Sequence, residues 1–168
     1  MKSGKLNSTL KVIEHISDLE PGRYPAFVPT MGALHDGHLS LIKLAQQYDP
    51  QTIISIFINP LQFESADDLA KYPKQLKQDI EKLNAVGSSA VLTPISSEIY
   101  PTAPEIIDAG VIGRMYEGES RAGHFDGVLT VVNRLLDLVK PKFAIFGEKD
   151  FQQLFLIKQL VWQRKIPV

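Results

Sequence analysis

The sequence contains no cysteine. Disulfides, zinc sites built from thiolates and cysteine nucleophiles are therefore excluded. A chain without disulfides suits the cytoplasm, where thiols are kept reduced, so we predict a cytoplasmic location. The sequence also lacks any apolar run of about eighteen residues, the length that a membrane-spanning helix needs, and we expect no membrane partner.

The chain has little net charge of either sign, with a formal value of −1 at pH 7. A protein that binds nucleic acid through its phosphates needs a positive field, so we expect no nucleic-acid partner. The composition of the 168 residues, with 44% hydrophobic and 22% charged residues, is that of one ordinary globular domain.

Short apolar runs alternate along the chain with segments of helical periodicity. Strands are predicted at residues 24–29, 52–58, 90–92, 105–108 and 142–146. Helices are predicted at residues 10–16, 39–48, 128–139 and 150–163, and from residue 76 through 83 to a close near Gly87. Such alternation indicates βαβ units, so we predict an α/β fold with a parallel sheet flanked by helices. Ligands of such sheets bind at the carboxyl ends of the strands, which directs attention to turns 29–38, 59–63, 94–100 and 147–150.

The first of these turns, "TMGALHDGHL", carries His35 and His38, two of the four histidines. Free backbone N–H groups and the helix dipole favour an anion where a glycine-bearing turn opens a helix. Two imidazoles beside that point are able to donate hydrogen bonds to phosphate oxygens. The residues alone leave three interpretations open: a phosphate site, a metal site that lacks a third ligand of suitable spacing, and a turn that binds nothing.

Two later turns carry polar side chains. In "FGEKDFQQ", Asp150 is placed as a helix N-cap, and Lys149 sits where a cation is unfavourable unless an anion is near. In "FINPLQFE", Asn59-Pro60 ends a buried strand and Gln62 follows at the rim, where it offers a donor and an acceptor. The alternative is a solvated turn with an ordinary cap and a surface glutamine.

Other polar segments favour structural interpretations. Arg121 and His124 in "ESRAGHFDG" face an anion in one interpretation, but a surface loop is favoured. Asp67, Asp68 and the lysines within 71–82 are expected to form a solvated face, with the charged residues of helix 76–83 on its outer side.

Five segments together resemble the pantothenate synthetase (pantoate–β-alanine ligase) family. They are "PTMGALHDGHLSL", "FINPLQF", "DDLAKYPK", "SRAGHFDGVLTVV" and "FGEKDFQQL", in the family's order over residues 29–154. The HxGH element alone is shared with a wider superfamily of nucleotidyltransferases and class I aminoacyl-tRNA synthetases. The resemblance implies a Rossmann-like fold and an ATP-dependent, Mg²⁺-assisted joining of pantoate to β-alanine. A pantoyl adenylate is the implied intermediate, with pyrophosphate and AMP released.

The resemblance also implies site residues. Catalytic roles fall to His38, His35 and Lys149, pantoate binding to Gln62 and Gln153, and β-alanine binding to Gln62. No protein ligand of a metal is assigned. The implied ATP-binding residues are Met31, Gly32, Ala33, Leu34, His35, Asp36, Gly37, His38, Gly147, Glu148, Lys149 and Asp150.

By the same resemblance, residues 1–168 form the N-terminal ATP- and pantoate-binding domain. The family's C-terminal domain, which covers the site and supports a homodimer, is absent from this chain. An uncovered site admits water, so we expect weak nucleotide binding and poor catalysis. The alternatives are a non-catalytic nucleotide-binding fragment, another HxGH-type nucleotidyltransferase acting on a phosphorylated substrate, and a metal-dependent hydrolase.

Overall fold

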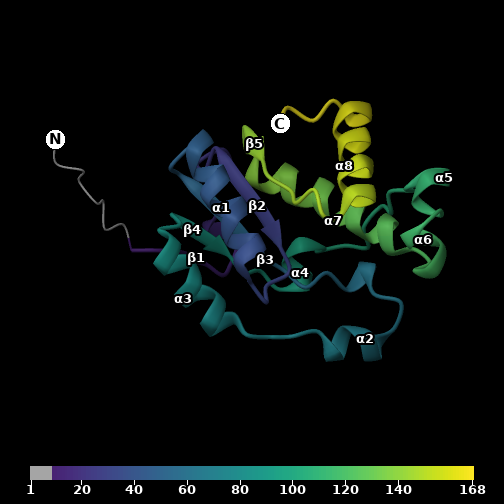
Figure 1. The fold of residues 1–168 in the computed structure, drawn as a ribbon, viewed down its shortest axis with the longest axis horizontal. Helices are drawn as coiled ribbons and strands as arrows, with labels where there is room; N and C mark the ends of the chain where they lie inside the picture. Colours follow the sequence, from purple (N-terminus) through teal and green to yellow (C-terminus); the bar gives the residue numbers. More distant parts are fainter. Residues whose placement is uncertain (1–8) are drawn as a thin grey trace.

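A five-stranded parallel sheet forms the centre of the molecule (Figure 1). The computed structural model describes residues 9–168, and residues 1–8 of the predicted domain lie outside the described part. The strand order is β1-β4-β3-β2-β5, and every pair of neighbours is parallel. The strands are β1 (Lys11–Ile13), β2 (Ala26–Thr30), β3 (Thr52–Ile56), β4 (Ala90–Leu92) and β5 (Phe143–Ala144). The predicted α/β fold is confirmed.

Helices cover both faces of the sheet. The α-helices are α1 (Asp36–Tyr48), α2 (Ala66–Lys71), α3 (Leu76–Val86), α4 (Ser96–Ile99), α5 (Gly110–Gly113), α6 (Glu117–Ser120), α7 (His124–Val139) and α8 (Phe151–Arg164). Two 3₁₀ turns are η1 (Ile16–Asp18) and η2 (Pro60–Gln62). In the part of the chain that is described, no helix is long and apolar enough to cross a bilayer.

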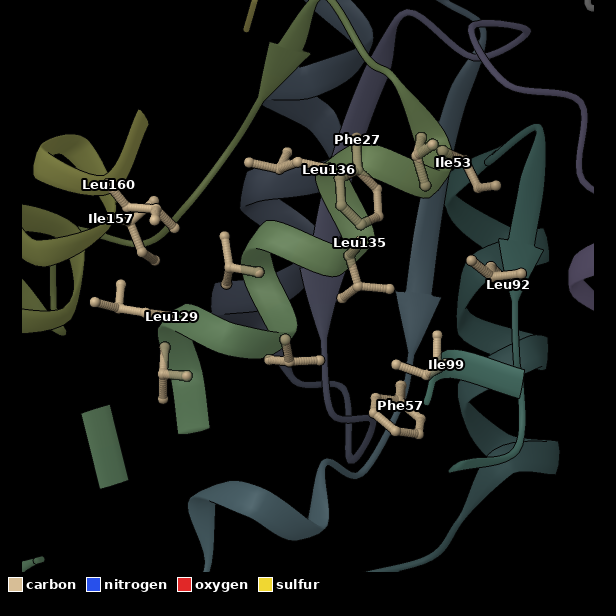
Figure 2. Packing of buried hydrophobic residues seen from close by; sticks show 14 of the residues in the cluster. Phe27, Ile53, Phe57, Leu92, Ile99, Leu129, Leu135, Leu136, Ile157 and Leu160 are labelled. Carbon is tan, nitrogen blue, oxygen red and sulfur yellow. The ribbon is translucent and has the colours of Figure 1, made fainter. Parts of the chain in front are cut away.

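Two apolar cores lie on opposite sides of the sheet. Figure 2 shows the larger one, in which Phe27 and Ile53 of the central strands pack against Leu135 and Leu136 of α7. On the other side, Val28 and Ile54 pack against Ile42 of α1 and Leu83 of α3. Alternate residues of β2 and β3 therefore enter different cores, which explains why the middle residues of both strands are apolar on both faces.

The order of the strands fixes where a ligand can bind. From β2 the chain passes through α1 to β3 on one side, and later returns through α7 to place β5 on the other side of β2. Since α1 and α7 cover opposite faces, a crevice opens beyond the carboxyl ends of β2 and β5. Parallel sheets bind ligands at such a switch point.

Two predicted elements are wrong. Residues 10–16 do not form a helix, because Lys11–Ile13 is an edge strand that pairs with β4 and buries Ile13. Residues 105–108 form no strand, and the Ile107 N–H is instead bonded to the hydroxyl of Thr130 on α7. In both cases contacts distant in sequence decide the conformation, and local periodicity does not contain them.

Candidate active site

A cavity of about 500 Å³ lies beyond the carboxyl ends of β2 and β5. Its wall contains ten of the predicted site residues: Met31, His35, Gly37, His38, Gln62, Gly147, Glu148, Lys149, Asp150 and Gln153. The structure thus brings together three turns that are far apart in sequence. The fourth turn considered, residues 94–100, does not reach this wall.

Gly32, Ala33, Leu34 and Asp36 are not on the wall, although the resemblance places them in the ATP site. Gly32 and Leu34 are buried beneath the turn. A Cβ on Gly32 would lie 3.0 Å from Ile56 and 3.1 Å from the Asp79 carboxylate, and its φ is +81°. Glycine is therefore needed at this position for its backbone conformation and for the lack of space around it.

The expectation of free backbone N–H groups in this turn is wrong for five residues. The Gly32 N–H donates to Thr30 Oγ1, and the N–H groups of Ala33 and Leu34 donate to Asp79. The His35 N–H donates to His38 Nδ1 at 3.4 Å, and the Gly37 N–H donates to His35 Nδ1 at 3.1 Å. The turn satisfies these donors internally, so they do not form a nest for an anion.

The same hydrogen bonds fix the protonation of the two histidine rings. Nδ1 of His35 and of His38 each accepts from a backbone N–H, so the proton of each neutral ring is on Nε2. The ring centroids are 4.2 Å apart. The pair therefore presents two neighbouring Nε2–H donors at the cavity.

The environment keeps His38 neutral. Burial lowers the pKa of His38 below its ordinary value of 6.5, and His35 lowers it further. The carboxylates of Asp79 and Asp150 act in the opposite direction, and Lys149 adds to the lowering. At pH 7 His38 is accordingly a hydrogen-bond donor without charge, until a polyanion enters and favours the protonated ring.

The Gly147–Asp150 turn forms the wall on the β5 side. Glu148, Lys149 and Asp150 are exposed, and Gln153 follows on the first turn of α8. Asp150 occupies the N-cap position as predicted, but its side chain makes no capping hydrogen bond. Its neighbour Gln152 points away from the cavity and bonds the backbone of Ile112, Met115 and Glu117.

Gln62 is on the cavity wall and is buried, with 7% of its surface exposed, so the alternative of a surface glutamine is wrong. Asn59, which is fully buried, donates from Nδ2 to Gln62 Oε1 at 3.1 Å and to the Gly127 carbonyl at 3.0 Å. The Gln62 Nε2 lies 2.9 Å from Met31 Sδ on the cavity wall. The amide oxygen of Gln62 is thus engaged, and its NH₂ group is the part presented to a ligand.

The start of α7 contacts the backbone of Gln62. His124 is buried, and its Nδ1 lies 2.8 Å from the Gln62 carbonyl oxygen. Burial lowers the pKa of His124, while that hydrogen bond raises it. Arg121 pairs with Glu117 at 2.8 Å. Neither Arg121 nor His124 is on the cavity wall, and His124 is buried at the start of α7 instead of lying in the surface loop that was predicted.

Sequence reasoning missed Tyr72 and Asp79. Tyr72 is on the cavity wall, and burial raises the pKa of its phenol, with a further contribution from Asp79. Asp79 is 1% exposed, so the expectation that the charged residues of this helix all lie outside is wrong. The quoted segment "DDLAKYPK" contained Tyr72, but nothing local distinguished Asp79 from its exposed neighbours.

The family model of pantoate-beta-alanine ligase matches residues 5–168. The chain belongs to the pantoate–β-alanine ligase family. It is 48% identical over 152 residues to the pantothenate synthetase of Psychromonas ingrahamii, covering 89% of this chain and 53% of that protein. With the pantothenate synthetase of Aliivibrio fischeri it shares 52% identity over 143 residues, or 83% and 49% of the two lengths. The chain thus spans about half the length of these relatives of the ligase family.

Two solved ligase structures have the same fold. The Francisella tularensis enzyme, complexed with beta-gamma ATP and beta-alanine, superposes with a TM-score of 0.88 at 42% identity, covering 95% of this chain and 64% of that one. The pantothenate synthetase of Thermus thermophilus gives a TM-score of 0.88 at 38% identity, covering 95% and 59%. The resemblance seen in the five sequence segments, and the Rossmann-like fold it implied, are confirmed.

Proposed function

We propose that this chain provides the ATP- and pantoate-binding part of an enzyme that joins pantoate to β-alanine. In the first step a pantoate carboxylate oxygen attacks the α-phosphorus of ATP, and pyrophosphate leaves. In the second step the amine of β-alanine attacks the carbonyl of the pantoyl adenylate, and AMP leaves. The cytoplasmic location and the homodimer of the whole protein stay predictions.

One observation carries the proposal: a single cavity contains both donor histidines, the Lys149 turn and the two glutamines. The histidines and Lys149 supply donors and positive charge for phosphates, and the glutamines supply uncharged donors for a hydroxy acid. Holding ATP and a carboxylic acid in one cavity accelerates their reaction chiefly by proximity, without a covalent enzyme intermediate.

The side chains have distinct tasks in this scheme. The Nε2–H groups of His35 and His38 donate to phosphate oxygens, and these bonds strengthen as negative charge accumulates on the departing pyrophosphate. Lys149, which is exposed, pairs with the phosphates as a flexible point charge. The NH₂ group of Gln62 and the side chain of Gln153 hold pantoate, and Gln62 contacts β-alanine in the second step.

Within residues 9–168, no group of three His, Cys, Asp or Glu side chains is arranged to hold a metal. Mg²⁺ generally binds through substrate phosphates and retains several waters. We therefore assign Mg²⁺ to the nucleotide itself, where it would neutralise phosphate charge.

The charge of the cavity favours the ligase over its alternatives. Among the described residues on the wall, Lys149 is the only lysine or arginine. A transferase that acts on a phosphorylated substrate needs a second basic group for that phosphate. A hydrolase that uses His35 and His38 as metal ligands is disfavoured because both Nδ1 atoms accept from backbone N–H groups, which leaves the ring proton on Nε2 and no free lone pair for a metal.

Calorimetric titration of the chain with Mg·ATP, and then with pantoate, tests the proposal. Replacing Lys149 by methionine should weaken ATP binding about tenfold, the worth of one charge-assisted contact. Lys142→Met, at an exposed position outside the cavity, is the matched control and should leave the affinity unchanged. Tightly retained zinc without ATP binding would overturn the assignment, and ATP binding without pantoate binding would favour the non-catalytic module.

A further inference from the structure

Asp79 joins α3 to the histidine turn through both of its carboxylate oxygens. Oδ2 accepts from the Ala33 N–H at 2.9 Å, and Oδ1 accepts from the Leu34 N–H at 2.8 Å. The side chain is 1% exposed, although the helix around it is largely charged and solvated. A buried carboxylate persists only when its oxygens are hydrogen-bonded, and here the turn supplies those bonds.

Lys82, one helical turn further along α3, holds the other side of the same peptide segment. Its Nζ donates to the Leu34 carbonyl oxygen, and its side chain is half-buried. Both polar groups of the Leu34 backbone are thus bonded to side chains of α3. Residues three positions apart share a helix face, so one face of α3 carries both contacts.

The turn needs this external support because its backbone conformation is unfavourable. Gly32 has φ of +81°, and Ala33, which carries a Cβ, has φ of +52°. Left-handed conformations at residues with a Cβ persist only where surrounding contacts enforce them. Leu34 then enters the core with 1% exposure, and His35 follows directly at the cavity.

We propose that Asp79 and Lys82 are positioning residues, which hold the Ala33–Leu34 backbone so that His35 and His38 meet the phosphates of the substrate. They act through the turn and do not line the cavity themselves. The functional part of this inference rests on the proposed ATP site. The position of the turn itself is independent of any ligand and is tested separately.

The test uses four variants of the whole chain. Asp79→Asn removes one of the two acceptors, and Lys82→Met removes the donor while keeping most of the apolar stem. Glu81→Gln and Lys77→Met change the same types of residue at exposed positions of α3 and serve as controls. Three quantities are measured for each: amide hydrogen exchange of Ala33 and Leu34, affinity for Mg·ATP, and the pH titration of the His38 imidazole by NMR.

We expect Asp79→Asn to speed exchange at Ala33 and Leu34 at least tenfold, while amides of β3 keep their protection. ATP affinity should fall by about tenfold or more, since small misplacement of binding groups is costly. The pKa of His38 should fall, because the Asp79 carboxylate raises it and this charge is removed in the variant. Lys82→Met should reproduce the exchange and affinity changes, with both controls unchanged.

Each outcome decides something distinct. Unchanged exchange at Ala33 and Leu34 in both variants refutes the contact, and rapid exchange with unchanged ATP affinity refutes the positioning role. If all amides of Asp79→Asn lose their protection from hydrogen exchange, that variant is unfolded, and Lys82→Met then provides the test of the contact and of the positioning role. If the unmodified chain binds no ATP, the proposed function fails, while exchange and the His38 titration still test the contact.

Discussion

Replacing Gly127 by alanine tests how closely α7 is packed against η2. A Cβ on Gly127 would lie 2.2 Å from the Leu61 carbonyl oxygen, 2.4 Å from its carbon and 2.7 Å from the Gln62 nitrogen. All three are backbone atoms, which cannot rotate away as the end of a side chain can. The two segments must therefore separate by at least about 1 Å to reach an ordinary contact distance.

The magnitude follows from the contacts that the separation would disturb. Overpacking costs about 1–3 kcal/mol, and alanine regains about 1 kcal/mol of helix propensity. The bonds from Asn59 Nδ2 to the Gly127 carbonyl, at 3.0 Å, and between His124 and the Gln62 carbonyl, at 2.8 Å, would lengthen. Each is worth about 1 kcal/mol, so the free energy of unfolding should fall by roughly 2–4 kcal/mol.

Thermal unfolding and pantoate binding provide the assays. For a chain of this size the loss corresponds to a midpoint lower by roughly 4–16 °C. Because η2 carries Gln62, affinity for pantoate in the presence of ATP should also fall, by up to about a hundredfold. Gly123→Ala is the control: its φ is +74°, but no atom lies within 4 Å of the added Cβ. It should cost about 1–2 kcal/mol through backbone strain alone and leave pantoate binding intact.

An unfolding midpoint of Gly127→Ala at or above that of the unmodified chain, with unchanged pantoate affinity, would refute the close packing. If Gly123→Ala lowers the midpoint as much as Gly127→Ala and also weakens pantoate binding, then backbone strain in α7, and not contact with η2, causes both effects.

Two further predictions concern pH and the neighbouring glutamines. His38 and His124 both have pKa values below 6.5 in the folded protein, so the unfolded chain binds more protons as the pH drops below 7. The free energy of unfolding, measured by chemical denaturation, should therefore fall between pH 7 and pH 5. His124→Gln should make this dependence on pH less steep. An unchanged slope would refute the burial of that imidazole. Gln152→Ala should lower the free energy of unfolding by about 2 kcal/mol because three hydrogen bonds to residues 112–117 are lost, whereas Gln153→Ala should weaken pantoate binding with little effect on stability. The reverse pattern would show that the two glutamines have been assigned the wrong way round.

The sequence was sufficient to predict those elements in which the local residue pattern and the tertiary contacts favour the same conformation. β3 is a run of β-branched and apolar residues between two covered faces, and α3 ends at Gly87, whose φ is +76°. Such features are dictated locally. β1 is different: its three residues are extended because β4 pairs with them, and the spacing of Leu10 and Ile13 fits a helix equally well. Partners some eighty residues away leave no local trace.

The site divides in the same way. His35, His38, Lys149 and the two glutamines could be proposed from the sequence because they follow predicted strands in segments that resemble a known family, and the structure brings them to one cavity. Asp79 could not be found, since its partners are backbone N–H groups, which every residue except proline carries. A carboxylate that bonds backbone has no complementary residue type for sequence reasoning to search for.

This difference changes how the site recognises an anion. A glycine-rich loop that binds phosphate through its own N–H groups is insensitive to pH, because those groups do not titrate. Here the N–H groups of five residues in the turn are already bonded within the protein, and the donors at the cavity are imidazole Nε2–H groups. Since the pKa of His38 is lowered, an incoming polyphosphate would draw a proton onto His38 as it binds. ATP binding near pH 7 should consequently be accompanied by proton uptake, measurable as a dependence of the calorimetric enthalpy on the ionisation enthalpy of the buffer. An enthalpy that is the same in all buffers would mean that His38 remains neutral in the complex.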